Sequence, residues 1–274
     1  MQTAQEIKNE EYFFLKLANT IKHTLKFESE KYSDSFLKRR ISVRMRATGL
    51  NNYSDYEEFF KDSKEEQEQM LKNLTIHVTE FFRDESFWEL CKTKFFKEVL
   101  KIFEKNKTIT IWSAGCSSGQ EAVSILITFL EINPNSKNKI KIICTDISED
   151  IIRKAQSFEY DKLFEIRGLK PEIINKYFTD NGETIKLKDE YKQYFKFLKH
   201  DILKEEFIKN IDVIFLRNTV IYFSKETKDV LYEKIYDHID NMGFFILGKT
   251  ETLTGPARDR FKVYDSKERI FEKS

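Results

Sequence analysis

The sequence predicts an α/β protein with a Rossmann-like, mostly parallel sheet, an all-α domain before it and a small antiparallel β-subdomain inserted into it. Residues 10–70 show only helical periodicity, whereas from residue 109 onward apolar runs alternate with helical patterns. The apolar runs 261–264 and 270–271 are typical of an antiparallel hairpin that closes the sheet. We expect three parts: a helical domain at 1–76, the sheet-bearing domain at 77–274, and the inserted β-subdomain at 177–199 within it.

Composition limits the classes of protein to which this chain can belong. Its formal net charge of +1 gives no overall attraction to nucleic acid. Cys91, Cys116 and Cys144 have no CxxC spacing, which favours a reduced, cytoplasmic protein over a disulfide framework or a metal site. The first residues lack the segments of a signal peptide, and no apolar run reaches the length of a membrane span. We expect a monomeric cytoplasmic protein without a metal and without direct insertion into a membrane.

The helical region has an uneven charge distribution. Ser33 or Ser35 is suited to cap a helix that ends at Gly49. Between residues 31 and 50 six basic residues accompany one acid, whereas between residues 53 and 70 seven acids outnumber two lysines. The basic helix can therefore dock on an acidic partner, or it can pair with the acidic helix that follows.

The stretch from Thr108 to Asp146 has the pattern of a nucleoside-binding unit. An apolar run ends in a turn of small residues from Ser113 to Gly119, a helical pattern follows, and a second apolar run ends at Asp146. Glycines let a ligand lie against the main chain, and the helix that starts there points its free N–H groups into the same space. An acid at the end of the second strand can accept hydrogen bonds from ribose hydroxyls. The alternative is an ordinary α/β turn with a solvated aspartate.

Later strands add polar residues to the same edge of the sheet. Asp201 and Asn218 each follow an apolar run, and ligands of open α/β sheets bind at the carboxyl ends of the strands. Asn181-Gly182 is a turn signal, and the alternating runs 185–187 and 194–198 predict an inserted hairpin around it. The closing antiparallel hairpin, together with the lack of a GxGxxG turn, favours a methyltransferase-type sheet over that of a dehydrogenase.

Five motifs in order give the chain a specific resemblance. They are Thr79–Asp84 (TEFFRD), Trp112–Glu121 (WSAGCSSGQE), Thr145–Ser148 (TDIS), Phe215–Phe223 (FLRNTVIYF) and Leu247–Glu251 (LGKTE). Together they strongly resemble the CheR family of chemotaxis receptor glutamate methyltransferases, over nearly the whole chain. The resemblance implies a class I S-adenosylmethionine-dependent methyltransferase sheet. It also implies methyl ester formation on glutamates in the cytoplasmic helices of chemoreceptors, for chemotactic adaptation, with S-adenosylhomocysteine as the other product and no nucleic-acid partner.

The resemblance also implies residue roles. Arg83 and Tyr222 match residues near the transferred methyl group. Twelve positions match cofactor contacts, with Asp146 on the ribose: His77, Thr79, Arg83, Ala114, Gly115, Glu121, Asp146, Ile147, Asp201, Ile202, Asn218 and Thr219. The basic helix resembles the receptor-docking surface of the family, which makes five residues candidates for substrate docking: Lys38, Arg39, Arg40, Arg44 and Arg46. The inserted sheet resembles the subdomain that in some members binds a peptide from the receptor's C-terminus.

Several positions depart from the usual family pattern, and three of them concern expected contacts. Gln120 replaces an acid beside Glu121, His77 replaces a cofactor-contacting asparagine, and Lys249 replaces a histidine. The short turn at Asn181-Gly182 leaves binding of a receptor tail open. Two alternatives therefore stand beside receptor methylation: a non-catalytic adaptor that binds S-adenosylmethionine, and a methyltransferase of a small carboxylic acid or of nucleic acid.

The chemistry expected of this family suits the residues present. A glutamate side chain has an unperturbed pKa of about 4.3, so at neutral pH it is already the nucleophile and needs no general base. This agrees with the lack of a recognisable His-Asp or Cys-His pair in the sequence. Arg83 is suited to orient the acceptor carboxylate by a two-point contact.

Overall fold

The computed structural model describes residues 4–75, 78–103, 108–134 and 139–273. The chain forms two compact units. The first consists of residues 1–76 with 222–228, and the second of residues 77–221 with 229–274. None of the helices in the described ranges is long and apolar enough to cross a bilayer.

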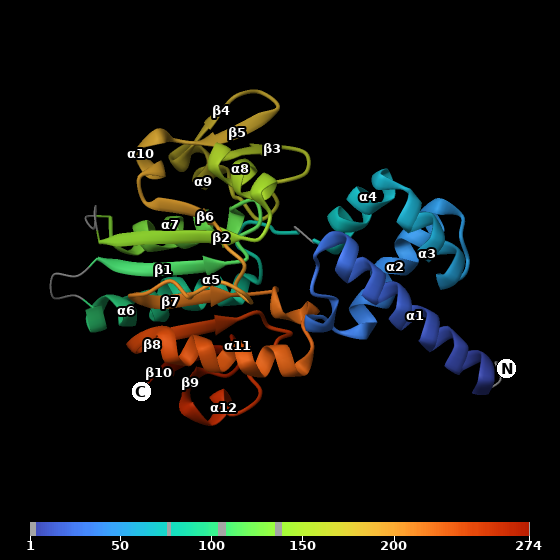
Figure 1. Ribbon diagram of the computed structural model, residues 1–274. Coiled ribbons are helices and arrows are strands. Elements are labelled where there is room, and N and C mark those ends of the chain that lie inside the picture. The colour runs from blue at the N-terminus through green and yellow to red at the C-terminus, as the bar shows by residue number, and fades with distance from the viewer. Residues whose placement is uncertain (1–3, 76–77, 104–107, 135–138, 274) are drawn as a thin grey trace. The chain divides into compact units, whose positions relative to one another are not determined.

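The first unit is all-α, as the sequence predicts. Its helices, drawn in blue to cyan in Figure 1, are α1 (Ala4–Leu25), α2 (Asp34–Thr48), α3 (Tyr53–Asp62) and α4 (Lys64–Leu74), with a 3₁₀ turn at Ser29–Lys31. Ser33 caps α2 because its Oγ accepts a hydrogen bond from the N–H of Phe36 at 3.4 Å. The helix ends at Gly49, whose left-handed φ of 75° favours glycine. Fully buried Phe14, Tyr56 and Phe60 belong to the core that joins these helices.

A short segment before α11 (Lys225–His238) belongs to this helical unit. Phe223 forms an antiparallel bridge with Tyr32. The N–H of Ser33 donates to the carbonyl of Tyr222 at 3.0 Å, and that of Ser224 donates to the carbonyl of Lys31 at 2.9 Å. Residues that are distant in sequence therefore complete the helical unit.

The second unit contains a seven-stranded sheet with the order β6-β2-β1-β7-β8-β10-β9 (Figure 1). Its strands are β1 (Ile109–Ala114), β2 (Ile140–Asp146), β6 (Phe195–Lys199), β7 (Ile211–Leu216), β8 (Ile239–Leu247), β9 (Phe261–Asp265) and β10 (Ile270–Lys273). The pairs among β6, β2, β1, β7 and β8 are parallel, whereas β10 pairs antiparallel with both β8 and β9. The predicted Rossmann-like sheet with an antiparallel end is confirmed.

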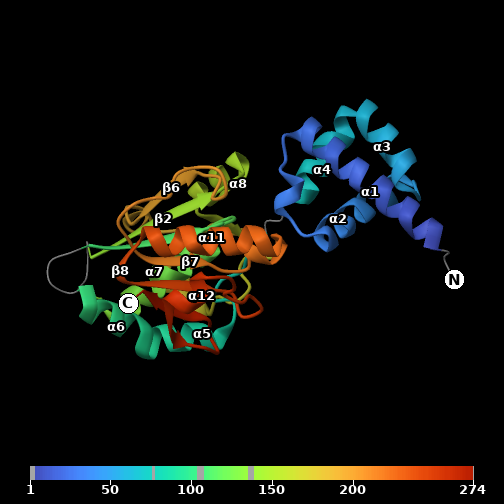
Figure 2. The same cartoon turned by 60° about the horizontal axis from the view of Figure 1, so that its bottom comes forward.

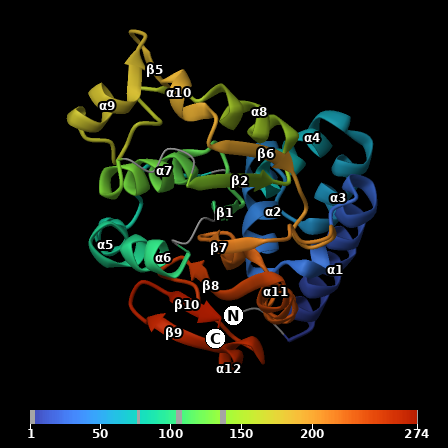
Figure 3. The same cartoon turned by 90° about the vertical axis from the view of Figure 1, so that its left-hand side faces the viewer.

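Helices cover both faces of this sheet. Figure 3 shows α6 (Phe96–Phe103) and α7 (Gln120–Ile132) on one side of the strands and α11 on the other, and Figure 2 shows α11 running beside β7 and β8. On the first side the ring of Phe95 lies 5.1 Å from that of Phe244, and on the second side Tyr232 lies 5.7 Å from Phe245. Consecutive residues of β8 therefore face opposite layers, as the pleat of a strand requires.

Short elements connect these layers. Before the sheet come α5 (Glu85–Leu90) and a π-helical turn at Cys91–Phe95. The remaining elements are α8 (Glu149–Ser157), β3 (Glu159–Asp161), α9 (Pro171–Tyr177), β4 (Phe178–Asp180), β5 (Thr184–Leu187), α10 (Asp189–Lys192), a 3₁₀ turn at Val220–Tyr222 and α12 (Ala257–Arg260).

The inserted antiparallel sheet exists, but its strands differ from those expected. Its order is β3-β5-β4, so the turn at Asn181-Gly182 joins β4 to β5, and the third strand comes from residues 159–161. The run 194–198, assigned to this hairpin from sequence, instead forms β6 at the edge of the main sheet, parallel to β2. Alternating apolar residues suit either kind of edge strand, so that pattern could not identify the pairing partner.

Candidate functional site

The turn after β1 brings the main chain close to the segment after β7. Gly115 has a φ of 74°, and a Cβ atom there would lie 2.6 Å from Oγ1 of Thr219. Only glycine therefore permits this approach. The N–H groups of Gly115 and Cys116 both donate to the carbonyl of Thr145 at 2.8 Å, which fixes the turn against the end of β2. Two of the predicted cofactor-binding positions are thus in contact.

Asp146 is buried at the end of β2, on the same edge. Its Oδ2 accepts a hydrogen bond from the N–H of Ser117 at 3.0 Å, and its Oδ1 accepts one from the N–H of Ser148 at 3.1 Å. A carboxylate oxygen can accept more than one hydrogen bond, so this residue type suits a ligand hydroxyl. Beside it, the buried Oγ of Ser117 has no hydrogen-bond partner among the described residues, so this edge contains a polar atom that a ligand can satisfy.

Glu121 lies in the first turn of α7, with its carboxylate between β1 and β7. Its Oε1 accepts a hydrogen bond from Ser113 Oγ at 3.1 Å, and its Oε2 accepts one from Arg217 Nη1 at 3.2 Å. Burial raises the pKa of Glu121 above its ordinary value, and the partners Arg217 and Ser113 offset this only in part. The carboxylate can therefore accept a further cationic donor.

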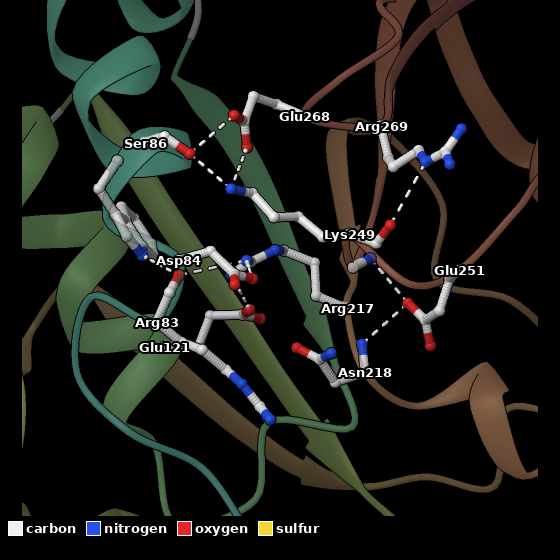
Figure 4. Close-up of polar contacts among 12 residues, drawn as sticks. Arg83, Asp84, Ser86, Glu121, Arg217, Asn218, Lys249, Glu251, Glu268 and Arg269 are labelled. Atoms are coloured by element: carbon white, nitrogen blue, oxygen red, sulfur yellow. Dashed lines mark hydrogen bonds and ion pairs between the residues drawn. The ribbon is translucent and has the colours of Figure 1, made fainter.

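Arg217 connects the parts of this site, as Figure 4 shows. Its side chain is 1% exposed. Besides Glu121, its Nη2 donates to Asp84 Oδ2 at 2.7 Å and to the carbonyl of Arg83 at 3.2 Å. The guanidinium carbon lies 4.2 Å from the ring centroid of Phe87. Sequence reasoning quoted Arg217 within a motif but did not assign it to the site, although an arginine that directly follows an apolar, buried strand must find partners.

Arg83 has a fixed main chain and a partly exposed side chain. Its neighbours Phe82 and Asp84 both have left-handed backbone, with φ of 50° and 66°. Such strain persists where the surroundings determine the conformation. Here the carbonyl of Arg83 also accepts a hydrogen bond from Trp88 Nε1 at 2.8 Å. The side chain of Arg83 is 38% exposed, and its Nε lies 4.0 Å from Glu80 Oε1. A weakly paired cation therefore projects from a rigid turn.

Asn218 is held by a buried carboxylate. Glu251 accepts hydrogen bonds from three main-chain N–H groups: that of Asn218 at 2.9 Å, that of Gly248 at 2.7 Å and that of Ile221 at 3.2 Å. Burial raises the pKa of Glu251, while these N–H groups act to lower it. Asn218 has a φ of 58°, so Glu251 secures an unfavourable backbone. Glu251 is a second residue with a structural part in the site that the sequence reasoning left unassigned.

The other predicted cofactor positions fall into different surroundings. Ala114 is buried at the end of β1, Thr79 is half-buried, and Ile147 is 42% exposed directly after Asp146. Asp201 and Ile202 follow β6, and the Asp201 Oδ1 accepts a hydrogen bond from the N–H of Leu203 at 3.0 Å. His77 lies outside the described residues.

Tyr222, the second predicted catalytic residue, groups with the helical unit. Its ring centroid lies 5.0 Å from that of Phe36 on α2. Its catalytic role stays a prediction.

The five basic docking candidates on α2 differ in their partners. Arg44 forms a two-point pair with Glu66 at 2.9 and 2.6 Å, and Lys38 pairs with Glu11 at 2.5 Å. The guanidinium of Arg40 lies 5.6 Å from the ring centroid of Phe36. Arg39 and Arg46 are exposed. The two interpretations of the basic helix thus apply to different residues: Arg44 pairs with Glu66 on α4, within the acidic region 53–70, and Arg39 and Arg46 are exposed.

Comparison with known proteins identifies the family. The model of the CheR methyltransferase SAM-binding domain matches residues 77–270, and that of the CheR all-alpha domain matches residues 13–75. This chain belongs to the CheR methyltransferase family. It is 28% identical to a chemotaxis protein methyltransferase of Listeria innocua serovar 6a, over 89% of this chain and 91% of the relative. It is 33% identical to a chemotaxis protein methyltransferase of Vibrio parahaemolyticus, over 69% of this chain and 70% of the relative.

The cofactor of this CheR family member is S-adenosylmethionine, as expected. Three features of the sheet edge fit that molecule. Asp146 presents acceptor oxygens suited to ribose hydroxyls, the unpartnered Ser117 hydroxyl lies next to it, and Glu121 offers a carboxylate suited to an ammonium group. Among the described residues no group of three or more histidines, cysteines or acids could hold a metal ion. The assignment of individual residues to the cofactor stays a prediction.

Proposed function

We propose that this CheR family member transfers the methyl group of S-adenosylmethionine to glutamate side chains of chemoreceptors and forms methyl esters there. One observation carries the proposal: Arg83 projects a weakly paired guanidinium from a rigid turn, and the same turn is joined through Arg217 to the cofactor residue Glu121. An anionic acceptor is therefore attracted to the edge where the cofactor is expected. The relatives named as chemotaxis protein methyltransferases support chemoreceptors as the substrate class.

Three residues would hold the cofactor in this proposal. Asp146 accepts from the ribose hydroxyls, and Glu121 accepts from the ammonium of the methionyl part. Gly115 lets the turn after β1 lie directly against Thr219 at the edge where the cofactor is expected. When bound, S-adenosylmethionine supplies an electrophilic methyl group on a sulfonium, which is a good leaving group.

The chain's own contribution to the reaction is positioning. The acceptor glutamate is ionised at neutral pH, so no residue has to remove a proton. Alignment of two reacting groups can lower a barrier by about 7 to 11 kcal/mol. Arg83 orients the acceptor carboxylate through two N–H donors, and the fixed turn around it restricts where those donors can lie. Tyr222 is proposed as the second residue near the transferred methyl group, and Arg39 and Arg46 as receptor contacts.

Methyl transfer to a receptor fragment tests this proposal. The chain is incubated with methyl-labelled S-adenosylmethionine and the cytoplasmic signalling fragment of a chemoreceptor, and base-labile label on the fragment is measured. We expect ester-linked label, and about a 10- to 100-fold loss of kcat/KM in Arg83→Gln, because a two-point contact to a charged group is lost. Arg153→Gln is the matched control, since Arg153 is an exposed arginine on α8 in the same unit.

Two outcomes would contradict the proposal. Cofactor binding by calorimetry without any labelling of the receptor fragment would favour a non-catalytic adaptor. Equal kcat/KM for Arg83→Gln and Arg153→Gln would remove Arg83 from acceptor binding while leaving the transfer reaction itself intact.

A further inference from the structure

The turn between β3 and α9 exposes two large apolar side chains. Leu163 is 85% exposed and Phe164 is 82% exposed, more than any other large hydrophobic residue in the described part of the chain. Their neighbours Ile166 and Leu169 pack against the hydrophobic core. Burying a leucine or phenylalanine side chain typically contributes about 1.5 to 3 kcal/mol, so this pair leaves a substantial stabilisation unused in the isolated chain. Adjacent exposed apolar residues of this size are typical of an interaction surface.

Hydrogen bonds hold this turn in one conformation. The Oδ1 of Asp161 accepts from the N–H of Leu163 at 2.7 Å and from that of Phe164 at 3.1 Å. The Oε2 of Glu165 accepts from the N–H of Asp161 at 2.8 Å and from Lys154 Nζ at 2.9 Å. A partner that binds here would therefore not have to order the turn, which lowers the entropic cost of association.

The same turn is fixed to the segment that carries Arg83. Gly168 has a φ of 88°, and a Cβ atom there would lie 1.9 Å from the carbonyl oxygen of Phe81. Glu80 joins the two segments by charge as well. Its Oε2 lies 3.2 Å from Arg167 Nε, and its Oε1 lies 4.0 Å from Arg83 Nε. Two arginines thus share one carboxylate, so these three side chains together carry a net positive charge. The Arg167 side chain is 86% exposed and faces solvent on this side.

We propose that Leu163, Phe164 and Arg167 form a docking surface for the helical segment of the protein substrate that carries the acceptor glutamate. This rests on the proposed function. Leu163 and Phe164 pack on apolar side chains beside the acceptor, and Arg167 attracts acidic residues of the same segment. The surface sets the affinity for the protein substrate, whereas Arg83 orients the reacting carboxylate.

Location and charge favour a protein substrate over other occupants. A protein that presents a glutamate to Arg83 must lay its own surface on the segments next to Arg83, and this turn is one of them. An amphipathic helix offers both apolar residues and acids within one or two turns. A membrane surface fits less well, because two of the basic residues around the turn already have acidic partners: Lys154 pairs with Glu165, and Lys162 pairs with Asp180.

The double variant Leu163→Ser/Phe164→Ser tests the docking surface. Methyl transfer to the receptor fragment should show KM raised about tenfold, which corresponds to about 1.4 kcal/mol, with kcat within about twofold of the wild type. The affinity for S-adenosylmethionine, measured by calorimetry, should not change. Val230→Ser/Val263→Ser is the matched control, since both residues are exposed apolar side chains elsewhere. If Leu163 and Phe164 had only a structural role, the double variant would instead show a lower kcat or a lower cofactor affinity, without a selective rise in the KM for the receptor fragment.

A second measurement does not depend on how the double variant folds. A photo-crosslinking amino acid replaces Phe164 in the full chain, with position 263 as the control. We expect crosslinks to the receptor fragment from position 164 only. Two results would overturn the docking surface and leave the proposed function intact, provided that the wild type methylates the fragment. One is equal crosslinking from positions 164 and 263, and the other is an unchanged KM in the double variant. Crosslinks between two copies of the chain would overturn it in favour of self-association. A wild type that methylates no receptor would overturn both proposals.

Discussion

Two arginine–glutamate pairs, one in each compact unit and each with one buried member, share the same chemistry but differ in how completely the carboxylate is satisfied. In the helical unit, Glu66 accepts two hydrogen bonds from Arg44 and a third from the hydroxyl of Tyr56 at 2.5 Å. At the sheet edge, Glu121 accepts one from Arg217, and that arginine is shared with Asp84 and a main-chain carbonyl.

The pKa directions reflect this difference. Burial acts to raise the pKa of both carboxyl groups. For Glu66 the hydrogen bonds from Arg44 and Tyr56 outweigh burial, and its pKa falls below the ordinary value. For Glu121 burial outweighs Arg217 and Ser113, and its pKa rises. A fully partnered carboxylate stabilises the fold, whereas an under-partnered one is suited to receive a cationic ligand.

The largest expected effect breaks the pair at the sheet edge. Arg217→Met leaves the carboxylates of Asp84 and Glu121 without their shared cation, and we expect a loss of about 3 kcal/mol in the free energy of unfolding. We also expect cofactor affinity to fall more than tenfold, because the turn at Arg83 and Glu121 both lose their anchor. Urea unfolding and calorimetry measure the two effects. Arg217→Lys keeps the charge without the two-point geometry, so its stability and cofactor affinity should lie between those of the wild type and Arg217→Met. Unaltered cofactor affinity in Arg217→Met would show that Arg217 does not support the cofactor site.

The second prediction concerns the fully partnered pair. Glu66→Gln should destabilise the helical unit by about 2 kcal/mol at neutral pH, because Arg44 loses a charged partner, with no change in cofactor affinity. The pKa of Glu66 is lowered by folding, so its stabilisation is complete above the unfolded-state value and is lost as the pH falls through the folded-state value. Urea unfolding at a series of pH values should show the wild type and the variant converging in acid. A constant difference between them at every pH would refute the charge argument.

Glu121→Gln applies the same substitution to the under-partnered pair, and the comparison predicts the opposite behaviour. Cofactor affinity should fall about tenfold, since a charge-assisted hydrogen bond to an ammonium is lost, whereas stability at neutral pH should not fall. The folded-state pKa of Glu121 is raised, so the wild type should bind the cofactor more weakly as the pH falls through that raised value.

Calorimetry at several pH values measures this dependence, which Glu121→Gln should lack. The charged and titratable groups near Glu121 include Arg217, Arg83, Asp84 and the buried thiols of Cys91 and Cys116, all present in both proteins. If the cofactor affinity of Glu121→Gln depends on pH as strongly as that of the wild type, the titrating group is not Glu121.

Sequence reasoning was most successful where a local pattern determines a local structure. The cap of α2, expected at Ser33 or Ser35 and found at Ser33, the end of α2 at Gly49 and the turn after β1 each depend on a few consecutive residues. It was wrong about the run 194–198, because pairing with β2 or with β5 depends on contacts between segments distant in sequence. The physical information that decides between two edge strands lies in their neighbours, which a periodicity of two does not identify.

The site shows the same division. Asp146 was predicted from the strand end that holds it, and Glu121 was implied by the family resemblance; the structure places both at one edge. Arg217 was missed as a site residue because its importance comes from Asp84, which is 133 positions earlier in the chain. Arg44 was predicted as a docking residue, yet its Nε and Nη2 both donate to Glu66 on α4. Charge clusters in sequence do not distinguish a satisfied arginine from an available one.

The smallest expected effect tests that distinction within α2. Arg39 and Arg46 are exposed, whereas Arg44 is paired, so only the first two are available to an acidic partner. Arg39→Gln/Arg46→Gln should raise the KM for a receptor fragment about threefold at low salt and should leave the free energy of unfolding within about 0.5 kcal/mol of the wild type. Because exposed charges are screened over about 8 Å at 0.15 M salt, the effect on KM should shrink as salt is added. Arg44→Gln is the control, and it should lower stability with little salt dependence. The opposite result would be a salt-dependent rise in KM for Arg44→Gln and no change in KM for the double variant. It would show that the Arg44–Glu66 pair opens to bind the receptor, and that Arg39 and Arg46 do not contact it.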